Sequence, residues 1–376
     1  MADPAEPGAL FIGLMSGTSM DGIDAALVSF GDARVDIIAT RSHEYPERLR
    51  TLLLESVRTP AGCTVDRIGQ MDNWTGGCFR DAALALIEHA GVSAEDVRAI
   101  GSHGQTLRHQ PRAARPFTLQ IGDPNIIAAG TGITTVADFR RRDVALGGEG
   151  APLAPAFHHW LFSNPGSVRA VLNIGGIANI TILGETAADV SGFDTGPGNT
   201  LLDAWAREQL SMPFDENGNW ARSGTVSEPL LAVMLDDPYF TQPPPKSTGF
   251  EYFNRAWLQA RLRAEGVPTV AFADVQATLS ELTARTIAIA LLGHAPDVEA
   301  VLVCGGGVHN ADLLNRLEGY LAGIAVNSTE QYGLHPDWVE AAAFAWLAKR
   351  CLDTKPGNIP AVTGASAPAI LGGIYQ

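Results

Sequence analysis

The sequence predicts an α/β protein built from two related halves. Short apolar strands alternate with amphipathic helices along most of its 376 residues. Many of the 40 glycines cluster where an apolar run ends, which is typical of backbone-lined binding loops. Two segments, LFIGLMSGTSMDGIDAALV and AVLNIGGIANITIL, share the order of apolar strand, glycine-rich turn and apolar strand. We interpret them as the starts of two halves, with chance similarity as the alternative because glycine hairpins are common.

The first half contains strands, one long helical region and several turns. Residues 46–91 have helical spacing and stop at Gly91, and Ser93 and Asp96 form a capping pair for a short helix. A turn is expected at Asp123-Pro124, before a short helix. Strands are expected at Leu10–Met15, Ile23–Phe30, 34–46, 97–106 and 134–139, and a further helix at 154–162.

The second half repeats the alternation. Strands are expected at 169–176 and 179–183, a polar loop at 193–200, a surface loop at 243–249, and helices at 201–210, 274–294, 311–321 and 335–352. Loops cluster within 135–167, so we place a domain boundary there. The prediction is one domain over 1–137, joined by the tail 360–376, and a second over 138–359.

The charge and cysteine content exclude several classes of protein. Lys and Arg total 26 against 41 Asp and Glu, a formal charge of −15, which disfavours binding to nucleic acid or anionic membranes. A phosphate ligand must therefore be held by backbone N–H groups, a few arginines or a metal. The four cysteines form no CxxC pair, and we find neither a signal peptide nor a run of membrane-spanning length. We expect a cytoplasmic protein.

The first glycine-rich loop, Gly17–Asp24, is a candidate phosphate site. Its successive N–H groups form a concave anion-binding turn, and Thr18 and Ser19 add hydroxyl donors. Asp21 can hold Mg²⁺ through water, and Asp24 can do the same or orient the turn. The alternative is a polar hairpin tip with no ligand. The candidate residues are Gly17, Thr18, Ser19, Met20, Asp21, Gly22, Ile23 and Asp24.

Common nucleotide and acyl-transfer motifs are missing from this chain. No lysine follows a glycine, so there is no Walker A loop. No GxGxxG opens a strand-to-helix turn, which argues against a dinucleotide oxidoreductase, and no GxSxG provides a nucleophile elbow.

Four other features are candidates for chemistry. Asp194 in GFDTGPGN lies just before a helix and could serve as its cap. Asn199 or Thr200 is closer to the start of that helix and better placed to cap it, so the Asp194 carboxylate is a candidate general base. Gly305, Gly306 and Gly307 can face an adenosine or a phosphate, or they can serve tight strand-to-helix packing. His103 is either a substrate ligand or a satisfied core histidine. The arginines in DFRRRD are expected to hold a carboxylate.

The chain resembles the anhydro-N-acetylmuramic acid kinase family, which belongs to the superfamily of sugar kinases, actin and heat-shock ATPases. The motifs that carry the resemblance are MSGTSMDGIDAAL, GSHGQT, ADFRRRDVALGGEGAPLAPAFH, LNIGGIAN, FDTGPGNTLLDAW, PKSTGFEYFN, LVCGGGVHN and PGNIPAVTGA. They run from residue 11 to the C-terminus. The resemblance implies two ribonuclease H-like α/β domains with an ATP and sugar cleft between them.

The resemblance also implies an activity and roles for residues. Water opens the 1,6-anhydro ring, O6 takes the γ-phosphate of ATP with Mg²⁺ as cofactor, and the product is N-acetylmuramic acid 6-phosphate in peptidoglycan recycling. Asp194 would activate the water, Gly17–Asp24 with Gly175 and Gly176 would hold phosphates, and Gly305–Gly307 would lie near adenosine. His103, Gln105, Arg140 and Glu330 are expected on the sugar side, and a homodimer is implied.

One residue departs from the family pattern. The loop reads GGEGAP where GGQGAP is expected, and Glu149 would either repel nucleotide or pair with Arg140 or Arg141. Two alternative functions stay open: a kinase for a related sugar without ring opening, and a non-catalytic ATP sensor of the same fold.

Overall fold

The protein folds as two compact α/β units, shown in a computed structural model that describes residues 8–17 and 20–376. The first unit comprises Met1–Phe162 and Trp338–Gln376, and the second comprises Ser163–Asp337. The sequence instead assigns 138–162 and 338–359 to the second domain. The difference arises because α5 (Ala154–Phe162) packs against α12 (Val339–Leu352), and α12 packs against strands of the first unit.

A six-stranded sheet forms the centre of the first unit, in the order β13-β7-β4-β1-β2-β3. Strands β1, β2 and β3 are antiparallel neighbours, whereas β1, β4 and β7 run parallel. A separate two-stranded sheet pairs β5 with β6. The strands are β1 (Leu10–Met15), β2 (Gly22–Gly31), β3 (Arg34–Glu44), β4 (Val97–Ser102), β5 (Gln105–Gln110), β6 (Phe117–Ile121), β7 (Thr135–Ala137) and β13 (Gly373–Tyr375).

The second unit has a five-stranded sheet in the order β10-β9-β8-β11-β12. Its strands are β8 (Arg169–Ile174), β9 (Ile177–Leu183), β10 (Ser191–Pro197), β11 (Ala300–Cys304) and β12 (Ala325–Ser328). Three antiparallel strands are followed by two parallel ones, which is also the arrangement of β3-β2-β1-β4-β7. The two glycine hairpins that match in sequence therefore occupy equivalent places in two sheets of like topology.

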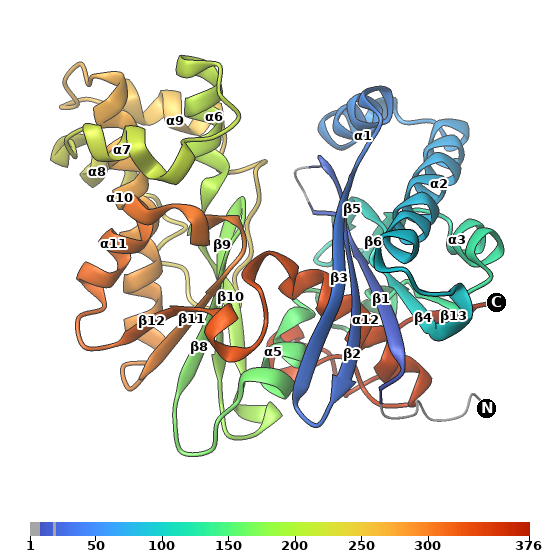
Figure 1. The fold of residues 1–376 in the computed structure, drawn as a ribbon. Helices are drawn as coiled ribbons and strands as arrows, with labels where there is room; N and C mark the ends of the chain where they lie inside the picture. Colours follow the sequence, from blue (N-terminus) through green and yellow to red (C-terminus); the bar gives the residue numbers. More distant parts are fainter. Residues whose placement is uncertain (1–7, 18–19) are drawn as a thin grey trace. The chain divides into compact units, whose positions relative to one another are not determined.

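Helices cover the sheet of the first unit (Figure 1). The region expected to be helical over 46–91 is divided into two helices, and the second is capped by the Thr64 hydroxyl and ends at Gly91 in the left-handed conformation, as predicted. The Ser93–Asp96 capping box is also present. The helices are α1 (Glu47–Arg58), α2 (Val65–Ala90), α3 (Pro124–Thr131), α4 (Arg141–Ala145), α5, α12 and α13 (Pro360–Thr363), with 3-10 turns η1 (Pro60–Gly62) and η2 (Ala94–Asp96).

The α12 helix lies unusually close to this sheet. Gly13 of β1 and Gly101 of β4 are paired in register. A Cβ at Gly13 would lie 1.8 Å from the Ala341 carbonyl oxygen, and one at Gly101 would lie 2.0 Å from that of Phe344. The helix is buried on nearly all sides. Two glycines side by side thus let a helix backbone pack directly on the strands.

The helices of the second unit surround a long central helix, α10 (Phe272–His294). The segment between α6 and α10, where the sequence pattern gives only the loop 243–249, contains three further helices. The helices are α6 (Asn199–Leu210), α7 (Asn219–Ser223), α8 (Glu228–Leu235), α9 (Arg255–Leu262), α10 and α11 (Ala311–Tyr320), with 3-10 turns η3 (Ala187–Asp189), η4 (Glu216–Gly218), η5 (Gly306–His309), η6 (Thr329–Tyr332) and η7 (Pro336–Trp338).

Candidate active site

Asp194 lies in β10, not in a loop as the sequence predicts. It pairs with Asn179 of β9, and the register shifts between Asp194 and Gly196. The pairing with β9 therefore imposes strand structure on a segment whose glycines and proline disfavour it.

Contacts from the 243–249 segment fix the Asp194 carboxylate. Its Oδ2 accepts hydrogen bonds from the Thr248 N–H (2.9 Å) and from the Ser247 hydroxyl (3.1 Å). Burial raises the pKa of Asp194 to about 6, although these two hydrogen bonds and the charge of Lys246 oppose the rise. Among the described residues, no hydrogen bond is made to Oδ1. The group is therefore a held carboxylate with one oxygen free to accept a proton near neutral pH.

Gly175 and Gly176 form the turn between β8 and β9. Their carbonyl oxygens accept hydrogen bonds from the first N–H groups of α6: Asn199 donates to Gly175 (2.8 Å) and Thr200 donates to Gly176 (3.0 Å). A Cβ at Gly176 would meet no atom nearer than 3.9 Å. Packing therefore does not require these glycines, which leaves room for a ligand above the turn.

The glycines 305–307 divide into two kinds. Gly305 has φ +77°, and a Cβ there would lie 2.3 Å from the Asn173 side-chain oxygen; a Cβ at Gly307 would lie 2.3 Å from the Ile174 side chain. Tight packing therefore explains Gly305 and Gly307. Gly306 is open, and the nearest atom to a Cβ there is the Asn199 side-chain nitrogen, at 3.9 Å. Asn199, which sequence reasoning treated only as a helix cap, thus stands beside both glycine turns.

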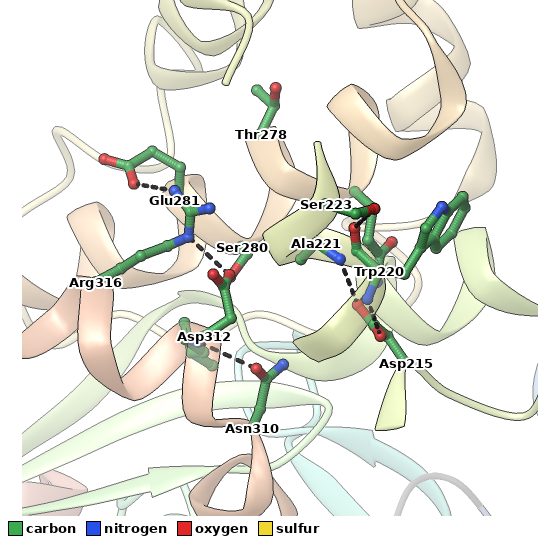
Figure 2. Close-up of polar contacts among 12 residues, drawn as sticks. Asp215, Trp220, Ala221, Ser223, Thr278, Ser280, Glu281, Asn310, Asp312 and Arg316 are labelled. Atoms are coloured by element: carbon green, nitrogen blue, oxygen red, sulfur yellow. Dashed lines mark hydrogen bonds and ion pairs between the residues drawn. The ribbon is translucent and has the colours of Figure 1, made fainter. Parts of the chain in front are cut away.

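A polar cluster fixes the helix that follows these glycines (Figure 2). The Asp312 carboxylate of α11 accepts from Ser280 (2.8 Å) and Arg316 (2.7 Å), and Arg316 also reaches Glu281 (2.9 Å). Asn310 caps α11 by accepting from the Leu313 N–H. The start of α11, and with it the end of the Gly305–Gly307 turn, is therefore tied to α10.

We expect Asp312→Ala to lower the free energy of unfolding of this unit by about 3 kcal/mol. The change leaves Ser280 without its acceptor and removes one of two partners of the largely buried Arg316. Thermal denaturation followed by circular dichroism measures the effect. Glu318→Ala, on the exposed side of the same helix, is the control. Equal melting temperatures for the two variants would contradict the assignment.

The first unit holds the Gly17–Asp24 loop, of which Thr18 and Ser19 lie outside the described residues. Ile23 is buried, and Met20 is buried with φ +54°. The Asp21 carboxylate is 2.7 Å from Arg50, and Asp24 accepts from the Ser42 hydroxyl at 2.7 Å. At Gly22, a Cβ would lie 2.5 Å from the His43 carbonyl oxygen.

Gln105 and His103 contact the base of that loop. The Gln105 amide donates to the Gly17 carbonyl oxygen (3.1 Å), and its oxygen lies 2.7 Å from the Ser16 hydroxyl. His103 Nδ1 lies 3.2 Å from the Ser16 carbonyl oxygen. Both side chains are buried. They therefore brace the loop from within the protein, which favours the core interpretation of His103.

Arg140 continues this network. Its guanidinium donates to His103 Nε2 (2.9 Å) and to the Gly150 carbonyl oxygen (2.8 Å). Burial and the charge of Arg140 hold the pKa of His103 well below its usual value, so the imidazole is neutral and accepts at Nε2.

Sequence reasoning missed Glu340, at the start of α12. Its side chain is solvent-accessible, yet desolvation by the protein around it raises its pKa while the charge of Arg140 lowers it. The expectation that the arginine run faces a carboxylate agrees with this arrangement. Glu330, which the resemblance implies on the sugar side, lies exposed in η6 of the second unit, whereas His103, Gln105 and Arg140 belong to the first unit.

Glu149 pairs with a residue that the sequence did not suggest. Its carboxylate lies 2.6 Å from the Arg112 guanidinium, so Glu149 forms its ion pair with Arg112 and not with Arg140 or Arg141. Arg141 instead faces Asp138 at 3.4 Å. The Glu149 N–H donates to the Thr363 carbonyl oxygen, and the neighbouring Gly150 N–H donates to the buried carboxylate of Asp143. The unusual glutamate is thus neutralised where it stands.

Comparison with known proteins gives one consistent family. The family model of anhydro-N-acetylmuramic acid kinase matches residues 9–376. The chain is 52% identical over 370 residues to an anhydro-N-acetylmuramic acid kinase of Coxiella burnetii, covering 98% of both chains. It is 53% identical over 369 residues to one of Xanthomonas campestris pv. campestris, covering 97% of both. One of Saccharophagus degradans is 50% identical over 97% of this chain and 98% of its own. The chain belongs to the anhydro-N-acetylmuramic acid kinase family.

Proposed function

We propose that this protein opens the 1,6-anhydro ring of anhydro-N-acetylmuramic acid with water and phosphorylates the released O6 from ATP. The product is N-acetylmuramic acid 6-phosphate, formed in peptidoglycan recycling. Family membership supports the substrate, and the held carboxylate of Asp194 is the observation that supports the chemistry.

The proposed chemistry needs a base and a phosphate site. Asp194 Oδ1 takes a proton from water while the water oxygen bonds to the anomeric carbon and the bond from that carbon to O6 breaks. O6 then bonds to the γ-phosphorus of ATP, and the bond from that phosphorus to the ADP oxygen breaks. Asp194 later returns its proton to solvent.

Backbone groups are the proposed nucleotide ligands. The N–H groups of Gly17–Asp24, Gly175 and Gly176 would hold phosphates, and the 305–307 turn would lie near adenosine. Of these, Gly176 and Gly306 have the open space that supports such a role, and we add Asn199 beside them. Arg140 and Glu330 remain proposed sugar ligands, whereas the contacts of His103 and Gln105 favour support of the Gly17 loop.

Mg²⁺ is a proposed cofactor carried by the nucleotide. The described residues contain no group of three His, Cys, Asp or Glu side chains able to hold a metal alone. Mg²⁺ does not need such a group, because it usually binds through one or two carboxylates together with water and substrate phosphates. Asp21, already paired with Arg50, would hold it through water. When bound, the ion would neutralise phosphate charge.

Location and assembly also belong to the proposal. None of the helices in residues 8–17 and 20–376 has the length and apolar character of a membrane span. We place the protein in the cytoplasm as a homodimer acting on small molecules, without nucleic acid or membrane partners. Its net charge of −15 supports the last point.

One experiment tests the function. Purified protein is incubated with Mg²⁺-ATP and the anhydro sugar, and products are identified by mass spectrometry. The 6-phosphorylated sugar, carrying one oxygen-18 when the reaction runs in labelled water, is expected. Phosphorylation of free N-acetylmuramic acid alone would favour a kinase without ring opening. ATP binding without turnover would favour a sensor.

The pH dependence of kcat/KM should have an acid limb with a midpoint near pH 6. Asp194 must be ionised to accept a proton, and its pKa is about 6, so activity falls about tenfold per pH unit below the midpoint and is constant above it. Initial rates between pH 4.5 and 8 at subsaturating sugar measure the limb. A flat profile down to pH 5 would contradict the proposed base.

A further inference from the structure

The loop expected at the surface contains a buried lysine beside Asp194. Lys246 is 7% exposed, and its Nζ lies 3.3 Å from the Tyr239 carbonyl oxygen, 3.4 Å from that of Phe240 and 4.8 Å from the centre of the Tyr239 ring. No carboxylate among the described residues forms an ion pair with it. Burying an ammonium group in this way is costly unless a nearby negative charge compensates.

The backbone of this lysine is attached to the proposed base. The Asp194 N–H donates to the Lys246 carbonyl oxygen at 3.1 Å, and the next two residues hold the Asp194 carboxylate. Tyr239, whose ring faces the ammonium, donates its hydroxyl to the Asp194 carbonyl oxygen at 2.9 Å. Lys246 and Asp194 are therefore neighbours through two independent sets of contacts.

A buried carboxylate fixes the surface on which the lysine rests. Asp237 accepts from the Tyr239 N–H (2.9 Å), the Tyr252 hydroxyl (2.8 Å), the Trp257 indole (2.7 Å) and Arg261 (2.6 Å). Phe253 packs on Tyr239 with ring centres 5.4 Å apart. Tyr239 is thus held by Asp237 at its backbone and by Phe253 at its ring. The protein itself therefore fixes the surface against which the Lys246 ammonium group packs.

We propose that Lys246 is a positioning residue for Asp194: it anchors the segment 246–248 that holds the carboxylate and supplies a positive charge that favours its ionised form. This inference rests on the proposed function. The charged and titratable groups around Asp194 are Lys246, Glu251 and Tyr239. The Lys246 charge lowers the pKa of Asp194, Glu251 raises it, and Asp194 in turn raises the pKa of Lys246 against the effect of burial.

The test compares Lys246→Gln with Lys246→Arg. Glutamine keeps a hydrogen-bond donor for the two carbonyls but loses the charge, whereas arginine keeps the charge. We expect Lys246→Gln to move the acid limb of kcat/KM upward by about 0.5 pH unit, and Lys246→Arg to move it by less than about 0.2. Lys355→Gln removes an exposed lysine elsewhere and should leave the midpoint unchanged.

A second readout does not depend on catalysis. Carbon-13 NMR of the Asp194 carboxyl, assigned with Asp194→Asn, follows its titration in the protein alone, and the same upward shift is expected in Lys246→Gln. If the wild-type protein lacks the proposed activity, this titration still tests the coupling of Lys246 to Asp194. An unchanged midpoint, with kcat reduced equally at every pH, would overturn the proposal.

Folding of the variants is checked by circular dichroism. If Lys246→Gln does not fold, Ser247→Ala takes its place, since it removes one donor from Asp194 Oδ2 without altering a buried group. We expect an upward shift of at least about 0.5 pH unit in the Asp194 midpoint, because the Ser247 hydrogen bond lowers the pKa of Asp194 more than the Lys246 charge does. A midpoint identical to wild type would show that the segment 246–248 does not control the carboxylate.

Discussion

Asp194→Asn is expected to fold normally, bind ATP and lose about 10³-fold in kcat. Asparagine keeps one oxygen, which can accept from Thr248 and Ser247 as Oδ2 does. The other oxygen becomes an amide nitrogen that cannot accept a proton from water. The loss should therefore fall on kcat, with the KM for ATP changed by less than about threefold. Steady-state kinetics with the anhydro sugar, together with ATP titration by calorimetry, measures both quantities.

The matched control is Asp236→Asn. Asp236 is an exposed aspartate in the same unit, and the proposal gives it no contact with substrate. It should keep wild-type kcat. If Asp194→Asn retained more than about a tenth of wild-type kcat, the base would have to be another residue. Unchanged circular dichroism and melting temperature would show that lost activity is not lost structure.

Gly13→Ala is expected to destabilise the first unit by about 4 kcal/mol or more. The added methyl group would lie 1.8 Å from the Ala341 carbonyl oxygen and 2.8 Å from the Ala345 nitrogen. Both are backbone atoms of α12, so no side-chain rotation relieves the overlap. Either the helix moves off the sheet or the strand shifts, and both expose core residues. We expect a fall of about 10 °C in the melting temperature.

Gly69→Ala is the control for this substitution. Gly69 is exposed inside α2, and a Cβ there meets no atom within 4 Å. Alanine should stabilise the helix by about 0.5–1 kcal/mol. The two alanine substitutions are thus expected to change the melting temperature in opposite directions. A Gly13→Ala protein that melts within about 2 °C of wild type would refute the close packing of α12.

Local patterns predicted the parts of the fold that local forces determine. The alternation of apolar runs predicted an α/β protein, and the two similar glycine hairpins predicted two related halves, which agrees with the like order of the two sheets. The end of α2 at Gly91 and the capping box at Ser93 follow from backbone hydrogen bonds within a few residues. The helices α7, α8 and α9 were missed because polar residues, glycines and prolines interrupt the pattern there.

Contacts between distant segments could not be predicted from composition or spacing. The 243–249 segment looks like a surface loop, yet Lys246 is buried because carbonyl oxygens of residues 239 and 240 accept from it. Glu149 pairs with Arg112, 37 residues away. Glu340 was not singled out from the sequence, since nothing local shows that the charge of Arg140 acts on its carboxyl group.

The helix α12 has a consequence for the order in which the chain is made. During translation, β1 and β4 leave the ribosome long before residues 339–352, which must cover Gly13 and Gly101. The second unit, Ser163–Asp337, is one continuous segment. Its synthesis is therefore finished before the last segment of the first unit, which starts at Trp338, is made. The nascent amino-terminal sheet therefore lacks the cover of α12 until residues 339–352 have been synthesised.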